Sequence, residues 1–164
     1  ILFRLVGSEM CIRDSVDAEA MFSRMKSMHD DLASARDMKT HIDVDQDLVI
    51  QVEVRLIEQA LSNLYQNALR YAAEGTTITL AAHRLPHRQI ELQVKDEGPG
   101  ISAEHQKRLF ERFYRVDRAR SREMGGTGLG LAIVKHIALH HGGEANVSSE
   151  VGSGSVFRIL LPER

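Results

Sequence analysis

Apolar positions recur with a helical period in three segments of the chain. From Val16 onward they follow at spacings of three and four, which predicts one long amphipathic helix reaching Ala35. A second helix is predicted over 55–73, because its apolar residues share one face: Leu56, Ile57, Ala60, Leu61, Leu64 and Ala68. A third is predicted over 131–141, where Gly142 and Gly143 follow as a stop.

Alternation of apolar and polar residues predicts six short strands, at 40–45, 48–54, 76–83, 89–96, 144–150 and 155–162. The third and fourth are separated by "RLPHR" and the last two by "VGSG", so each pair is expected to form an antiparallel hairpin. We therefore expect an α/β (α+β) two-layer sandwich, in which helices cover one face of a mixed, mostly antiparallel sheet.

Composition narrows the class of protein. The chain has 164 residues, 43% hydrophobic and 27% charged, which suits one domain with its own core. Its 21 basic and 23 acidic side chains give a formal charge of −2, so the charge balance does not indicate nucleic acid or an anionic membrane as a partner. No apolar run approaches the roughly 20 residues that cross a bilayer.

The first fifteen residues differ from the rest. "ILFRLVGSEMCIRDS" has neither helical nor strand periodicity, and Val6 to Ser15 is similar to a translated sequencing adapter. We expect residues 1–15 to be a non-native, poorly packed extension and the domain to occupy 16–164. The only cysteine, Cys11, lies in this extension, so the domain itself offers no thiol chemistry.

The stretch "MGGTGLGLAIVKHI", starting at Met124, suggests a phosphate lying against backbone amides. It is not a P-loop, because Leu131 and Ala132 follow the last glycine where Lys and Ser/Thr are required. It is not a dinucleotide-binding turn, because "RARSREM" before it is no strand. What remains is a glycine loop at a helix N-terminus, preceded by a polar lid over 102–126 that is partly helical over 103–113. A flexible turn before a core helix is the alternative.

Two further groups of polar residues accompany this loop. Asn63, Asn67 and Arg70 have spacings of four and three, so they line one edge of the second helix. Amide oxygens suit Mg²⁺ that is shared with nucleotide phosphates, although a solvated helix edge would have the same pattern. Asp96 falls on the inward face of its strand, where an adenine amine could supply its hydrogen-bond donor. A turn-capping aspartate explains "DEGPG" equally well.

These pieces, in this order, resemble the ATP-binding catalytic domain of sensor histidine kinases, in the superfamily that includes topoisomerase and chaperone ATPases and shares the Bergerat fold. "NLYQNALRYA" is similar to the family's N box, "DEGPG" to its first glycine box, "FERFYR" to its phenylalanine box and "GGTGLGLAIVK" to its second glycine box. The resemblance extends from about Val16 to Pro162.

The resemblance implies roles for individual residues. Asn67 would hold Mg²⁺, Asn63 and Arg70 would lie at the phosphates, and Asp96 would recognise adenine. The implied ATP-binding set is Asn63, Asn67, Arg70, Tyr71, Asp96, Gly98, Gly100, Ile101, Gly126, Thr127, Gly128, Leu129 and Gly130. Phe110 and Phe113 would anchor the lid, and Arg112 or Arg115 would assist catalysis. Glu53 stands where the family commonly has aspartate.

Asn63 helps to distinguish among the members of the superfamily that this sequence resembles. The ATPases and serine kinases of the superfamily resemble one another in placing a glutamate at this position as general base, and an amide cannot accept that proton. The resemblance therefore implies phosphoryl transfer to a nucleophile that needs no such base, a histidine. An ATPase or serine kinase, or a non-catalytic nucleotide-binding module, remains the alternative.

The phosphoacceptor histidine of the family lies on a separate dimerisation domain, and none of the eight histidines here has its sequence context. His29, His41, His83, His87 and His105 stand in polar surroundings and are expected to be exposed, and His136, His140 and His141 to lie on the polar edge and last turn of the third helix. We expect a catalytic fragment that binds Mg-ATP without autophosphorylating. Its implied partners are the missing dimerisation domain and a response regulator receiver domain. The resemblance places it in the cytoplasm, within a parent kinase anchored in the bacterial inner membrane.

Overall fold

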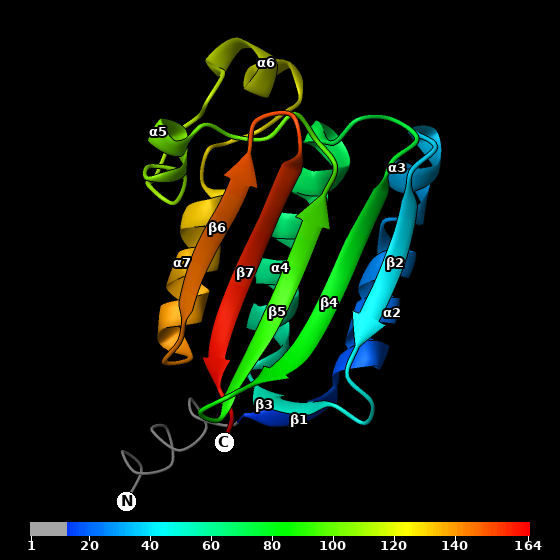
Figure 1. Ribbon diagram of the computed structural model, residues 1–164, viewed down its shortest axis with the longest axis vertical. Helices are drawn as coiled ribbons and strands as arrows, with labels where there is room; N and C mark the ends of the chain where they lie inside the picture. The colour runs from blue at the N-terminus through cyan, green and yellow to red at the C-terminus, as the bar shows by residue number, and fades with distance from the viewer. Residues whose placement is uncertain (1–12) are drawn as a thin grey trace, which may run out of the picture.

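A five-stranded sheet forms one layer of the fold in the computed structural model, which describes residues 13–164. Strand order is β2–β4–β5–β7–β6, with bounds Lys39–Val44, Thr77–Leu85, Gln89–Asp96, Gly154–Pro162 and Glu144–Glu150. The pair β2 and β4 is parallel, and the other neighbours are antiparallel. Both predicted hairpins and the mixed, mostly antiparallel sheet are therefore confirmed (Figure 1).

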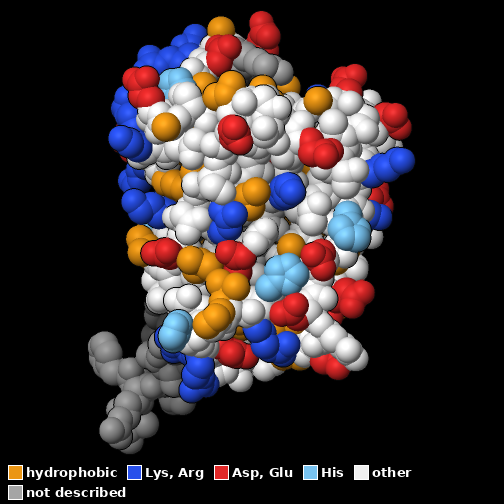
Figure 2. Space-filling model, viewed as in Figure 1, with side chains coloured by type: hydrophobic (Ala, Val, Ile, Leu, Met, Phe, Trp, Pro, Cys, Tyr) orange, Lys and Arg blue, Asp and Glu red, His pale blue; other side chains and the backbone are white. Residues whose placement is uncertain are grey.

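Three helices cover one face of this sheet: α2 (Ala18–Met28), α4 (Val54–Tyr71) and α7 (Gly130–His140) (Figure 1). Three shorter helices are α3 (Asp30–Ala35), α5 (Ala103–Gln106) and α6 (Arg118–Glu123). The opposite face of the sheet carries interspersed acidic, basic and histidine side chains (Figure 2). The predicted two-layer sandwich is confirmed, because the apolar side of the sheet is the side that the helices cover.

The core lies between α4 and the inward side chains of the central strands. The buried face of α4 consists of Ile57, Ala60, Leu61, Leu64, Tyr65, Ala68 and Leu69. It packs over alternate residues of β4, β5 and β7, among them Leu80, Leu92 and Ile159, each fully buried. The strand period that buries Leu92 and Val94 also turns Asp96 inward, as predicted.

A small second sheet lies at the end of the large sheet that is at the bottom of Figure 1, and its first strand begins earlier in the chain than expected. Strand β1 (Asp14–Asp17) pairs antiparallel with β3 (Val49–Val52). Asp14 and Ser15 thus belong to the fold, so the predicted boundary after residue 15 was too late, and Val16 is in a strand rather than a helix. Residues 1–12, which hold most of the predicted extension and Cys11, lie outside the described residues.

The long N-terminal helix predicted to Ala35 was wrong, because it is interrupted at His29. That residue leaves the helical region with φ −121° and ψ 10°, and its ring packs edge-on against Tyr65. Its Nε2 lies 3.0 Å from the Ser62 hydroxyl of α4. This tertiary contact divides the apolar repeat into α2 and α3 and leaves Met28 exposed.

Helix α7 ends as predicted, and its end buries a histidine. The N–H groups of Gly142 and Gly143 donate to the carbonyls of Leu139 and Ala138, with Gly142 at φ +77°. His141 is 2% exposed. Its Nδ1 donates to the Ile137 carbonyl at 2.8 Å, and its Nε2 accepts the N–H of Glu53 at 3.1 Å. Burial lowers the pKa of His141, so the neutral ring is favoured in the fold.

The other histidines divide between surface and interior. His136 and His140 are exposed, and His140 Nε2 lies 3.1 Å from the Glu53 carboxylate. The expectation that His29, His83 and His105 are exposed was wrong, because all three are half-buried against neighbouring side chains, the last two against Asp45 and Tyr114. No helix among residues 13–164 is long and apolar enough to cross a membrane.

Acidification should destabilise this fold partly through His141. A histidine whose folded pKa is lowered keeps its contribution above its ordinary pKa of about 6.5 and loses it as pH falls through the folded value. We expect the melting temperature to fall between about pH 7.5 and about pH 5.5, and to fall less in His141→Gln. Thermal melts should show this, with exposed His136→Gln as the matched control. Equal pH dependence in His141→Gln and the natural chain would contradict it.

Candidate functional site

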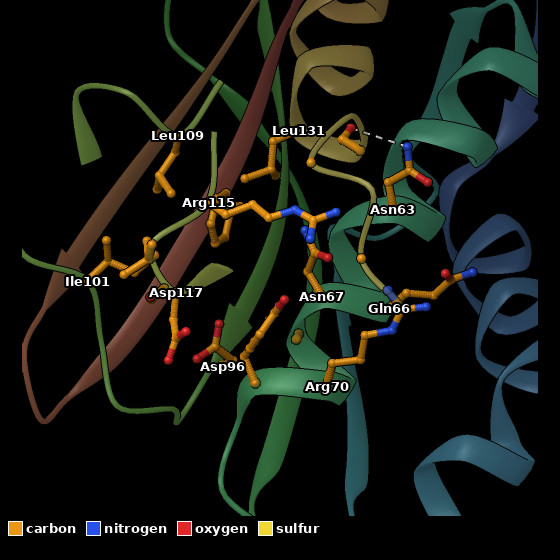
Figure 3. Close-up of a pocket in the computed structure, with 18 of the residues that line it drawn as sticks. Asn63, Gln66, Asn67, Arg70, Asp96, Ile101, Leu109, Arg115, Asp117 and Leu131 are labelled. Carbon is orange, nitrogen blue, oxygen red and sulfur yellow. Dashed lines mark hydrogen bonds between the residues drawn. The ribbon is translucent and has the colours of Figure 1, made fainter. Parts of the chain in front are cut away.

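A cavity of about 600 Å³ opens between the C-terminal half of α4, the ends of β5 and β7, and the segment that joins β5 to α7 (Figure 3). Twelve of the residues implied by the sequence line it: Asn63, Asn67, Arg70, Tyr71, Asp96, Gly100, Ile101, Arg115, Gly126, Thr127, Gly128 and Gly130. Gly98, Leu129 and Arg112 are not among the lining residues. Segments distant in the chain therefore converge on one space.

The polar edge of α4 forms one wall. Asn63, Gln66, Asn67 and Arg70 all line the cavity, since residues three and four apart on a helix lie above one another. The Asn63 amide donates to the Gly130 carbonyl at 3.3 Å, which joins α4 to the start of α7. Arg70 extends toward Gln66 rather than toward Asp96 (Figure 3).

Asp96 lies at the opposite end of the cavity from Asn63 (Figure 3), only 8% exposed. Burial raises the pKa of its carboxyl, while N–H groups of Gly98 and Ser155 donate to it and act in the opposite direction. The Gly98 N–H lies 2.8 Å from Oδ1. A buried carboxylate with a raised pKa and a face on a cavity is a candidate for binding a hydrogen-bond donor.

Close backbone approaches hold the loop after Asp96 in place. A Cβ at Gly98 would lie 2.8 Å from Asp96 Oδ1 and 3.3 Å from the Tyr71 carbonyl. Gly100 has φ +75°, and a Cβ there would lie 2.0 Å from the Glu150 carbonyl. The turn between β6 and β7 fixes this loop from the other side, because Gly152 donates to the Pro99 carbonyl at 2.8 Å. Gly98 thus shapes the cavity without lining it.

The second glycine loop meets the lid at one strained contact. Gly128 has φ +74°, and its carbonyl accepts the N–H of Phe113 at 2.9 Å. Phe113 itself has φ +64°, an uncommon conformation for a bulky residue. The loop leads into α7. The first amide N–H groups of this helix have no partner within the helix, and they lie at the end that borders the cavity. Leu129 contributes here through its N–H, which donates to the Thr127 hydroxyl at 3.3 Å.

The lid departs from the prediction in three respects. Helix is confined to Ala103–Gln106 rather than 103–113, and α6 adds a turn later in the segment. Phe110 packs edge-on against Phe157, but Phe113 is 69% exposed and anchors nothing through its ring. Arg115 reaches into the cavity toward Asn67, whereas Arg112 is exposed (Figure 3).

Several lining residues were not predicted: Gln66, Leu109, Tyr114, Val116, Asp117, Leu131, Ser155 and Phe157. Ser155 and Phe157 come to the cavity because β7 pairs with β5, where Ser155 is opposite Asp96. Only strand pairing reveals this. Gln66 could have been found, since it continues the helix edge of Asn63 and Asn67.

The hydrogen-bonding and charged groups around the cavity suit a ligand that has a flat end with an amine and an opposite end with several negative charges. The buried acceptor is at Asp96, whereas amide groups, arginines and a helix N-terminus lie elsewhere around the same cavity. Such a helix terminus favours negative charge. Among the described residues, no group of three or more His, Cys, Asp or Glu side chains could hold a metal ion. The amide oxygen of Asn67 is a hard ligand, suited to a divalent cation that phosphates share.

Comparison with known proteins identifies relatives of this chain. It is 40% identical over 163 residues to the sensor-like histidine kinase SenX3 of Mycolicibacterium smegmatis, covering 99% of this chain and 42% of that protein. It is 41% identical over 119 residues to the sensor histidine kinase WalK of Bacillus subtilis, covering 72% of this chain and 20% of that protein. The chain thus spans less than half the length of these relatives.

Solved structures agree with this relationship. Full-length ShkA in complex with AMPPNP matches with a TM-score of 0.81 and 26% identity, over 92% of this chain and 31% of that one. Mycobacterial sensor histidine kinase MprB matches with a TM-score of 0.78 and 26% identity, over 93% and 99% of the two chains. The family model described as "Histidine kinase-, DNA gyrase B-, and HSP90-like ATPase" matches residues 51–164. The chain therefore belongs to this family, and the relatives SenX3 and WalK are sensor histidine kinases.

Proposed function

We propose that this domain binds Mg-ATP and donates its γ-phosphoryl group to a histidine on a separate dimerisation domain. One observation carries the proposal: Asp96, Asn67 and Gly128, which are far apart in the chain, line the same cavity. The relationship to sensor histidine kinases supports the choice of reaction. The bound AMPPNP of ShkA supports the choice of nucleotide.

The proposed orientation of ATP follows the charge distribution of the cavity. Asp96 accepts the adenine amine at the buried end, with Gly98 and Gly100 keeping the loop close to the base and Tyr71 and Ile101 beside it. The triphosphate extends toward the start of α7, where amides of the loop from Gly126 to Gly130 donate to it. Arg70 and Arg115 offset its charge, and Arg112 joins them if the lid closes.

Catalysis in this proposal is positioning and charge neutralisation. Asn67 would hold Mg²⁺, which when bound would supply positive charge to offset that of the phosphates. The Asn63 amide donates a hydrogen bond to the Gly130 carbonyl and so connects α4 to the end of the glycine loop. Asn63 has no carboxylate that could deprotonate water. Phosphoryl transfer to an imidazole, which needs no deprotonation by this helix, fits that arrangement better than hydrolysis does.

The partners follow from the same relationship. The phosphoacceptor belongs to a dimerisation domain of the same kinase, and the phosphoryl group passes from there to a response regulator receiver domain. The whole kinase is proposed to lie in the inner membrane, with this domain on the cytoplasmic side.

Asn67→Ala should remove the magnesium ligand without disturbing the core, because Asn67 lies on the edge of α4 and faces the cavity. We expect affinity for AMPPNP in MgCl₂ to fall by about 100-fold, equivalent to about 2.8 kcal/mol. Calorimetric titration measures this. Gln59→Ala, an exposed amide on the same helix, is the matched control. Unchanged affinity in folded Asn67→Ala would refute the magnesium assignment.

Asp96→Asn should weaken adenine binding by about 10- to 100-fold, because an amide N–H would face the adenine amine and leave two donors opposed. Glu97→Gln is the control, since the Glu97 side chain accepts the Thr77 N–H at 2.9 Å instead of lining the cavity. Titration with AMPPNP should separate the two variants. Equal affinities would place the base elsewhere.

Phosphotransfer distinguishes the kinase from its alternatives. With ATP radiolabelled at the γ-phosphate, the isolated chain should stay unlabelled and should label a supplied dimerisation domain that carries the acceptor histidine. Replacing that histidine should abolish the label. Steady phosphate release by the chain alone would favour an ATPase, and nucleotide binding with neither reaction would favour a regulatory module.

A further inference from the structure

The Arg36 side chain caps the C-terminal end of α4 and lies outside the cavity. Its guanidinium donates to three main-chain carbonyls of α4 and its cap: those of Leu69, Arg70 at 2.8 Å and Ala72 at 2.9 Å. Its own carbonyl accepts the N–H of Gly75 at 3.2 Å. Both ends of the turn that leads from α4 to β4 are therefore attached to one residue.

This contact suits the chemistry of a helix end. The last carbonyls of a helix have no partner within the helix, and the dipole there favours a cation. A guanidinium presents several N–H groups in a fixed plane, so it can satisfy three carbonyls together, which a lysine ammonium cannot match in geometry. The Arg36 side chain is only 21% exposed, and its nearest carboxylate, Glu74, lies 3.8 Å away and is mostly exposed.

The capped end of α4 is also a wall of the loop beside Asp96. A Cβ at Gly98 would lie 3.3 Å from both Ala72 Cα and the Tyr71 carbonyl, so the loop rests directly on these two residues. Gly98 in turn donates to Asp96 at 2.8 Å. A continuous series of contacts therefore connects Arg36, the end of α4, Gly98 and the carboxylate at the buried end of the cavity.

We propose that Arg36 is a positioning residue for adenine recognition, holding the end of α4 against Gly98 so that Asp96 keeps its orientation. Arg36 does not line the cavity and would not touch the nucleotide. The inference rests on the proposed function because that function supplies the ligand, whereas the arrangement of Gly98 and Asp96 can be measured without a nucleotide.

The test compares Arg36→Met, Arg36→Lys and Arg24→Met with the natural chain. Arg24 is the matched control, because it also contacts α4, through Glu58 at 2.9 Å, but at the far end from the cavity and mostly exposed. The first measurement is amide hydrogen exchange at Gly98, with Leu92 in the sheet centre as internal reference. The second is the ratio of affinities for AMPPNP and GMPPNP in MgCl₂.

In Arg36→Met the Gly98 amide should exchange about tenfold faster, while the exchange of Leu92 should be unchanged. The preference of this variant for AMPPNP over GMPPNP should fall about tenfold, because a residue that supports the site is lost. Arg36→Lys, which keeps the charge and serves if the methionine variant does not fold, should lie between. Normal Gly98 exchange and nucleotide preference in these variants, or an equal change in Arg24→Met, would overturn the proposal. If the natural chain binds neither nucleotide, the proposed function fails, and Gly98 exchange alone decides the role of Arg36.

Discussion

The packing of α4 on the sheet determines where this protein can place polar groups. Its apolar face is buried from Ile57 to Leu69, so the helix cannot rotate without losing the core. The edge that carries Asn63, Asn67 and Arg70 is consequently fixed beside the ends of β5 and β7. Because Asp96 comes at the end of an apolar strand that packs under the same helix, core packing and the geometry of the cavity are set by one interaction.

The site keeps features that a fold selected only for stability would avoid. Asp96 is a buried carboxylate whose pKa burial raises, which means that its charged form is disfavoured in the fold. Phe113 adopts a left-handed conformation while its ring is exposed. Strain and buried charge of this kind concentrate where a ligand is bound. Both features border the cavity or the loop that forms its wall.

Local signals in the sequence predicted most of the fold. Periods of 3.6 and 2 located α4, α7 and the two hairpins, and the glycine pair after α7 located its end. The break at His29 could not be predicted, because it depends on Ser62 and Tyr65 of another helix. Strand β1 was missed because its pairing with β3 is a long-range contact between short, weakly patterned segments.

The sequence motifs identified several residues that line the cavity, but they did not identify all of its lining. Asn67, Asp96 and Gly128 could be selected from their boxes, but the contributions of Ser155, Phe157 and Arg36 follow from strand pairing and helix capping that no local pattern encodes. Glu53 shows why local patterns are insufficient. It precedes α4, but its carboxylate does not cap that helix and instead contacts His140, 87 residues away in sequence.

Residues from α4, the first glycine turn and the second glycine loop are proposed to bind one magnesium-bound nucleotide together. This shared site can be tested by recording the backbone amide shifts of the isotope-labelled chain while AMPPNP is added in MgCl₂. If the three segments share one nucleotide, saturable shifts are expected at Asn67, Gly98 and Gly128 with a common midpoint, and little change is expected in β2. Absence of saturable shifts, or shifts grouped around β1 and β3 instead, would contradict a shared site.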